Sequence, residues 1–115
     1  MGNVYQKMDP DDRTRLRIII GNSNSFFTAL DRVNVLRTAF AGQSYLESAI
    51  MNINHEGTPA NVAWATLEHL KWLTNPNSSP VKLYLEAIKD TFNEKDPIQA
   101  KLKEELSVIM DKYKF

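Results

Sequence analysis

The chain has no cysteine among its 115 residues, which excludes disulfide bonds, thiolate nucleophiles and cysteine-ligated metal sites. It also has no net formal charge, because 14 basic side chains balance 14 acidic ones. A protein whose main task is to neutralise phosphates usually carries a basic excess, so this balance argues against such a task. No apolar run approaches membrane-spanning length, and the polar first residues lack the apolar segment of a signal peptide. We therefore expect a cytoplasmic globular protein.

The residues that are present favour helices. A capping residue precedes proline four times, at Asp9-Pro10, Thr58-Pro59, Ser79-Pro80 and Asp96-Pro97, as is typical of helix starts. No segment shows the alternation of apolar and polar residues that a half-buried strand requires. The sequence predicts an all-α fold of six helices, with residues 1–8 as a flexible lead-in and residues 9–115 as a single domain.

The apolar spacing predicts where these helices lie. The first begins at Asp9 and ends at Gly21 in the left-handed conformation, and the second begins at Ser25. A short third helix begins at Ser44, which forms a capping box with Glu47. The fourth helix, within Gly57 to Leu73, is apolar most of the way round, so we expect it to be a buried central helix. The predicted core includes Leu30, Trp64 and Ile98.

Histidine adjoins a carboxylate at His55-Glu56 and at Glu68-His69. A zinc protease needs two histidines one helical turn apart, and neither position has a histidine at that offset. No serine lies in a nucleophile elbow, and no glycine-rich loop with a phosphate-binding lysine is present. The sequence therefore predicts no catalytic residue, no cofactor and no metal site, and we expect that the chain is not an enzyme.

The two kinds of basic residue are distributed unevenly. All arginines lie between Arg13 and Arg37, whereas every lysine except Lys7 lies in the second half of the chain. Arginine is enriched at protein interfaces and lysine is depleted there, so this distribution is compatible with a protein-binding face, with a solvated surface or with phosphate contacts. Interspersed aspartates oppose the phosphate interpretation. Trp72 points off the main face of its helix. It is either a second buried contact or an exposed anchor for a partner. The candidate partner-binding residues are Arg13, Arg17, Arg32, Arg37 and Trp72.

A series of short motifs resembles the bacterial effector-associated domains, small helical adaptors similar to the death-fold superfamily. The motifs are Asp12-Arg13-Thr14-Arg15-Leu16, Phe26-Phe27, the spaced Arg32, Leu36 and Ala39, Gly57-Thr58-Pro59, and Val62-Ala63 followed by Leu67 and Leu70. They cover nearly the whole chain after the lead-in. One departure concerns the end of the fourth helix, where a glycine is expected shortly after Leu70 and Lys71-Trp72 stand instead.

The resemblance implies a death-fold-like bundle that works as an adaptor. Such domains are fused to, or paired with, effectors such as caspase-like peptidases, other proteases and signalling NTPases in bacterial defence and programmed cell death. They recruit partners through helical contacts between like domains, so the implied partner is another effector-associated domain or a fused effector, without a small-molecule substrate or a membrane. The alternative is a small helical nucleic-acid-binding protein or transcription regulator, which a salt-dependent shift of duplex DNA would reveal.

Overall fold

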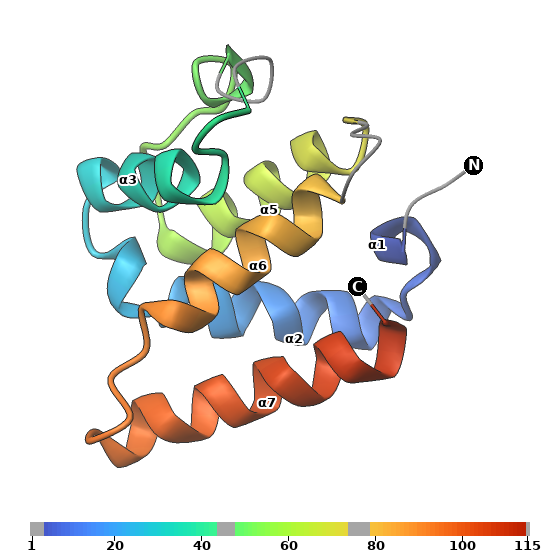
Figure 1. Ribbon diagram of the computed structural model, residues 1–115, viewed down its shortest axis with the longest axis vertical. Helices are drawn as coiled ribbons and strands as arrows, with labels where there is room; N and C mark the ends of the chain where they lie inside the picture. The colour runs from blue at the N-terminus through green and yellow to red at the C-terminus, as the bar shows by residue number, and fades with distance from the viewer. Residues whose placement is uncertain (1–3, 44–47, 74–78, 115) are drawn as a thin grey trace.

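The computed structural model describes residues 4–43, 48–73 and 79–114 (Figure 1). Residues 48–50 are helical, and the remaining helices are α1 (Val4–Lys7), α2 (Pro10–Gly21), the 3-10 helix η1 (Asn24–Phe26), α3 (Ala29–Ala39), α5 (Pro59–Leu70), α6 (Pro80–Asp90) and α7 (Pro97–Tyr113). These described ranges contain no strand, which confirms the all-α prediction. Within them no helix combines the length and the apolar character that crossing a membrane requires.

Proline sets the start of each long helix except α3. The residues before α6 and α7 add a side-chain cap, because Ser79 accepts a hydrogen bond from the Lys82 N–H and Asp96 accepts one from the Ile98 N–H. Helix α3 begins later than predicted, since residues 24–26 form η1 and Thr28, not Ser25, is its N-cap. The Thr28 side chain accepts a hydrogen bond from the Asp31 N–H at 3.1 Å.

Helix α2 lies between α5 and α7 and runs antiparallel to both (Figure 1). Its last residue, Gly21, meets the start of α5: a Cβ added there would lie 3.2 Å from the Ala60 nitrogen and 3.3 Å from the Pro59 carbonyl carbon. The glycine is therefore needed for close packing of two backbones. The prediction that Gly21 is left-handed is wrong, since positive φ among the described glycines occurs at Gly42 and Gly57.

One cluster of apolar side chains joins the helices. Burying a large aliphatic or aromatic side chain contributes about 1.5–3 kcal/mol, so this cluster is the main source of stability. Its members include Leu16, Ile19 and Ile20 of α2, Val35 and Leu36 of α3, Val62, Ala63, Leu67 and Leu70 of α5, Val81, Tyr84, Leu85 and Ile88 of α6, and Leu102, Leu106 and Ile109 of α7.

The first described residues also belong to the core. Tyr5 and Met8 are buried, with exposed fractions of 1% and 3%, and Tyr5 lies in the short helix α1. The prediction of a loose lead-in is therefore wrong for residues 4–8. The predicted capping box of Ser44 and Glu47 lies outside the described residues, and the death-fold-like arrangement of six helices stays a prediction.

Three residues predicted to be in the core lie on the surface. Leu30, Trp64 and Ile98 are exposed, because each of their helices has more apolar residues than its packed face can hold. Helix α5 shows this most clearly: it buries Val62, Ala63, Thr66, Leu67 and Leu70 but leaves its first turn and Trp64 in solvent. The prediction of an enclosed central helix is therefore wrong for α5.

Candidate partner-binding surface

A hollow of about 240 Å³ lies where α1, α2 and α5 meet. Helix α2 contributes two arginines four residues apart, and α5 contributes a tryptophan and a glutamate at the same spacing. Residues at this spacing lie on one face of a helix, so each helix turns one stripe toward the hollow. We call it the arginine–tryptophan hollow; its lining residues are Tyr5, Pro10, Arg13, Thr14, Arg17, Trp64 and Glu68.

Neither arginine of the hollow forms an ion pair with a carboxylate of the described ranges. Arg17 donates from Nη2 to the Thr14 hydroxyl at 3.1 Å, and the Cζ atom of Arg13 lies 6.0 Å from the centre of the Tyr5 ring. Arg15, between them in sequence, pairs instead with Glu105 on α7. A guanidinium has five N–H donors, so both arginines of the hollow keep donors for a partner.

The tryptophan side of the surface continues past the end of α5. Glu68 forms an ion pair with Lys71, and the Lys71 ammonium lies 5.1 Å from the centre of the Trp72 ring. Trp64 is 47% exposed and Trp72 is 72% exposed. Trp64 thus lines the hollow, Trp72 lies beside Lys71 outside its lining, and both rings are accessible to a partner.

Three charged residues of the hollow act on Tyr5, which also lines it. Burial raises the pKa of the Tyr5 phenol above its ordinary value of 10.0, and the Glu68 carboxylate raises it further. Arg13 and Arg17 act in the opposite direction and lower the pKa. The surface is therefore a set of interacting charges around one buried phenol, with two cations against one anion.

The structure brings together three of the five predicted partner-binding residues. Arg13 and Arg17 line the hollow, and Trp72 is connected to it through Lys71 and Glu68. Arg37 is exposed on α3 and does not line it. Trp64 was predicted to lie in the core, and no role was predicted for Tyr5. The available signal was the spacing of Trp64 and Glu68, which places both side chains on one face of α5.

Arg32 is a correction to the prediction, because its side chain is only 5% exposed. Its Nη1 donates to the carbonyls of His55 at 2.8 Å and Gly57 at 3.0 Å, and its Nε and Nη2 donate to the Phe26 carbonyl at 3.2 and 3.0 Å. The guanidinium carbon also lies 5.6 Å from the centre of the Phe26 ring. Arg32 therefore holds the 55–57 loop against η1 and is not available to a partner.

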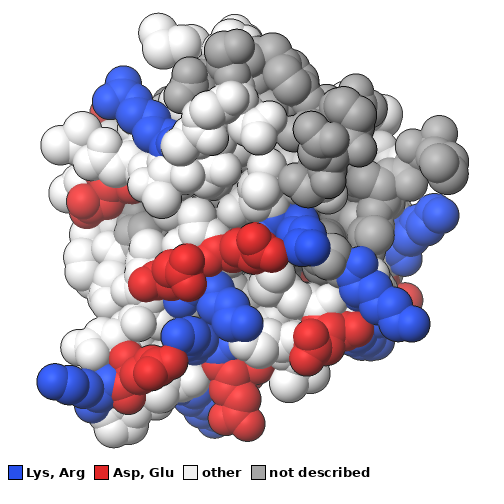
Figure 2. All heavy atoms as spheres, in the orientation of Figure 1, with Lys and Arg blue, Asp and Glu red and all other residues white. Residues whose placement is uncertain are grey.

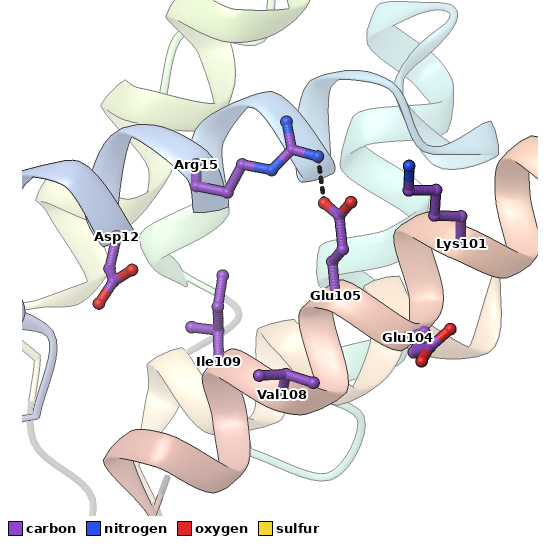
Figure 3. Close-up of a pocket in the computed structure, with 7 residues that line it drawn as sticks. All are labelled: Asp12, Arg15, Lys101, Glu104, Glu105, Val108 and Ile109. Carbon is purple, nitrogen blue, oxygen red and sulfur yellow. Dashed lines mark hydrogen bonds and ion pairs between the residues drawn. The ribbon is translucent and has the colours of Figure 1, made fainter.

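A second hollow, of about 360 Å³, lies between α2 and α7 (Figure 3). In Figure 3 the Arg15 side chain reaches across it to Glu105, and Ile109 points from α7 toward α2. At its other end Asp12 accepts hydrogen bonds from Lys112 and from the Tyr113 hydroxyl. These bonds, the one from Lys112 above all, lower the pKa of the Asp12 carboxyl below its ordinary value of 3.8. Three of the charged residues that line this hollow, Asp12, Arg15 and Glu105, are therefore paired within the chain.

Within the described residues neither histidine forms an ion pair with a carboxylate. No group of three or more histidines, aspartates and glutamates within these ranges is placed to hold a metal ion. The Nε2 atom of His55 lies 2.9 Å from the Ile50 carbonyl, and Glu68, next to His69 in sequence, pairs with Lys71.

Comparisons with protein-family models, with curated proteins and with solved structures found no match to this chain. The resemblance to effector-associated domains therefore stays a prediction.

Proposed function

We propose that this chain is a non-catalytic adaptor domain that binds a protein partner through the arginine–tryptophan hollow. The class of partner follows from the resemblance alone: an effector such as a caspase-like peptidase or a signalling NTPase in bacterial defence or programmed cell death. The geometry of α1, α2 and α5 supports the hollow as the place of binding. These two parts of the proposal are independent, and the experiment below tests the second.

One observation carries the proposal. Arg13 and Arg17 have no ion-pair partner among the described carboxylates, and they line one hollow with the half-exposed ring of Trp64. Tryptophan and arginine are the residues that most often dominate the energy of a protein interface, because each combines a large contact area with directed hydrogen bonds. An acidic segment with an apolar side chain would satisfy both arginines and cover the tryptophan.

Nucleic acid is the weaker candidate. A phosphate backbone requires several cations along one surface, and Figure 2 shows basic and acidic side chains interspersed over the lower half of the face it displays. Within the hollow itself Glu68 lies among the cations. The formal charge of the chain is zero. These features favour a protein partner with a mixed, mainly acidic surface.

The test reverses the two arginines together in the variant Arg13→Glu/Arg17→Glu. The matched control is Lys95→Glu/Lys101→Glu, which makes the same change in net charge at two exposed lysines outside the hollow. Each tagged chain is used to capture proteins from an extract of the source cells, after circular dichroism has shown that its thermal unfolding matches the wild type. A third variant, Trp64→Ala, removes the aromatic wall.

We expect the wild type and the lysine control to retain the same proteins, and both hollow variants to lose them. If Arg13→Glu/Arg17→Glu captures the same proteins as the wild type, the hollow is not the binding surface. A parallel titration with duplex DNA tests the alternative: a shift that weakens with salt and disappears in the arginine variant would assign the hollow to nucleic acid.

A further inference from the structure

The arginine–tryptophan hollow contains more hydrogen-bond donors than acceptors. Among the described residues the guanidiniums of Arg13 and Arg17 have one acceptor, the Thr14 hydroxyl, which is bonded to Arg17 and keeps its own hydrogen for donation. Tyr5 is only 1% exposed, and its hydroxyl donates to no acceptor of the described ranges. Both arginines act on the charge of this hydroxyl, so the donors lie close to one another.

The carboxylate that lines the hollow is already neutralised. Glu68 forms an ion pair with Lys71, which does not belong to the lining. Burial raises the pKa of the Tyr5 phenol and the Glu68 carboxylate raises it further, so the hydroxyl keeps its proton and is a donor at neutral pH. The hollow therefore offers two positive charges and two hydroxyl donors beside the half-exposed ring of Trp64.

A phosphate monoester matches these donors better than a carboxylate does. A carboxylate carries one charge and is satisfied by one arginine in a bidentate pair. A phosphorylated side chain carries about 1.5 to 2 negative charges at pH 7 and three acceptor oxygens, so it neutralises two arginines and accepts from a hydroxyl as well. The hollow measures about 240 Å³, less than the roughly 300–1,000 Å³ of pockets that enclose small-molecule ligands, and this size suits a single side chain.

We propose that the arginine–tryptophan hollow binds a phosphorylated side chain of the protein partner. This inference rests on the proposed function, because it names the group that the same surface recognises. The phosphate lies between Arg13 and Arg17 and accepts a hydrogen bond from the Tyr5 hydroxyl, and an apolar residue next to it in the partner covers Trp64. Phosphorylation of the partner therefore controls whether the two proteins bind.

The test measures peptide binding by isothermal titration calorimetry. Four peptides share a leucine on each side of a central residue, which is phosphoserine, phosphotyrosine, glutamate or serine. We expect one phosphorylated peptide or both to bind at least about tenfold more tightly than the glutamate peptide, because the phosphate adds charge-assisted hydrogen bonds, and the serine peptide not to bind. If the glutamate peptide binds as tightly as both phosphorylated peptides, or if no peptide binds, the phosphate site is wrong.

Variants show whether the phosphate occupies the hollow. Arg13→Glu/Arg17→Glu should abolish binding of the phosphorylated peptide, whereas the lysine control Lys95→Glu/Lys101→Glu should bind it as the wild type does. Tyr5→Phe removes the hydroxyl alone and should weaken binding several-fold without a change in thermal unfolding. Unchanged affinity in the arginine variant would overturn the site, and unchanged affinity in Tyr5→Phe would overturn the role of its hydroxyl as a donor.

Two further measurements separate this site from its alternatives. AMP carries the same phosphate monoester on a nucleoside, and tighter binding of AMP than of either phosphorylated peptide would assign the hollow to a nucleotide instead. Treating the cell extract with a phosphatase should abolish capture of the partner by the wild-type chain. If capture survives the phosphatase but is still lost in Arg13→Glu/Arg17→Glu, the proposed function stands and the requirement for phosphate is wrong.

Discussion

Replacing Arg32 with methionine should destabilise the fold more than any surface change in α3. Methionine keeps most of the length of the side chain but removes every donor, and the carbonyls of Phe26, His55 and Gly57 lose the hydrogen bonds that Arg32 gives them. A buried polar group left without its partner costs about 1–3 kcal/mol. Removing the desolvated guanidinium offsets part of this cost. We expect a net loss of about 2–4 kcal/mol, because three carbonyls lose their donor and this offset reduces their summed cost.

The assay is urea unfolding followed by circular dichroism, which does not depend on the exposed tryptophans. With a slope of about 1.5–2 kcal/mol per molar urea, the expected loss lowers the midpoint by about 2 M. Arg37→Met is the matched control, because Arg37 is exposed on the same helix, and it should change stability by less than about 0.5 kcal/mol. A lysine at position 32 restores the charge but not the planar fork, so Arg32→Lys should remain clearly destabilised. Equal urea midpoints for Arg32→Met and Arg37→Met would show that the hydrogen bonds of Arg32 to the three carbonyls do not stabilise the fold.

Three further predictions concern single groups. Tyr84→Phe should be neutral or stabilising by up to about 1 kcal/mol, because the buried Tyr84 hydroxyl has no hydrogen-bond partner among the described residues and the nearby Thr66 hydroxyl donates to the Val62 carbonyl; a clear loss of stability in urea unfolding would show that the hydroxyl has a partner. Gly21→Ala should destabilise by about 1 kcal/mol, since the clash with α5 exceeds the gain in helix propensity; a higher melting temperature would contradict the close packing. Asp12 has a lowered pKa in the folded chain, so its contribution is present above pH 3.8 and is lost as the pH falls through the folded value. The gap in urea midpoint between wild type and Asp12→Asn should therefore close in acid, and a constant gap would contradict the pairing with Lys112.

The sequence predicted helix starts well because their causes are local. Proline at the first helical position and a capping side chain before it act within one turn, so α2, α5, α6 and α7 begin at the predicted residues. The error at α3 has a local cause too: residues 24–26 turn as a 3-10 helix, and Thr28 after them is the N-cap of α3.

The candidate surface was harder to predict because it depends on tertiary contacts. The sequence pattern of an amphipathic helix predicts a surface position for Arg32, and only the folded chain brings two distant carbonyls, those of His55 and Gly57, to its guanidinium. The error for Trp64 is the reverse, because it was predicted to be buried and is exposed. Helix α5 has apolar residues on more than one face, and the sequence does not say which face α2 and α6 leave in solvent.

The central claim is that a protein partner covers the arginine–tryptophan hollow, and Trp64 reports on this directly. In the variant Trp72→Phe, Trp64 is the single tryptophan of the chain, and its half-exposed ring should be quenched readily by acrylamide. The measurement is acrylamide quenching of this variant, alone and with the purified protein that the wild type captures. The account predicts a several-fold lower quenching constant in the complex. Unchanged quenching in a complex that has demonstrably formed would place the partner elsewhere and contradict the account.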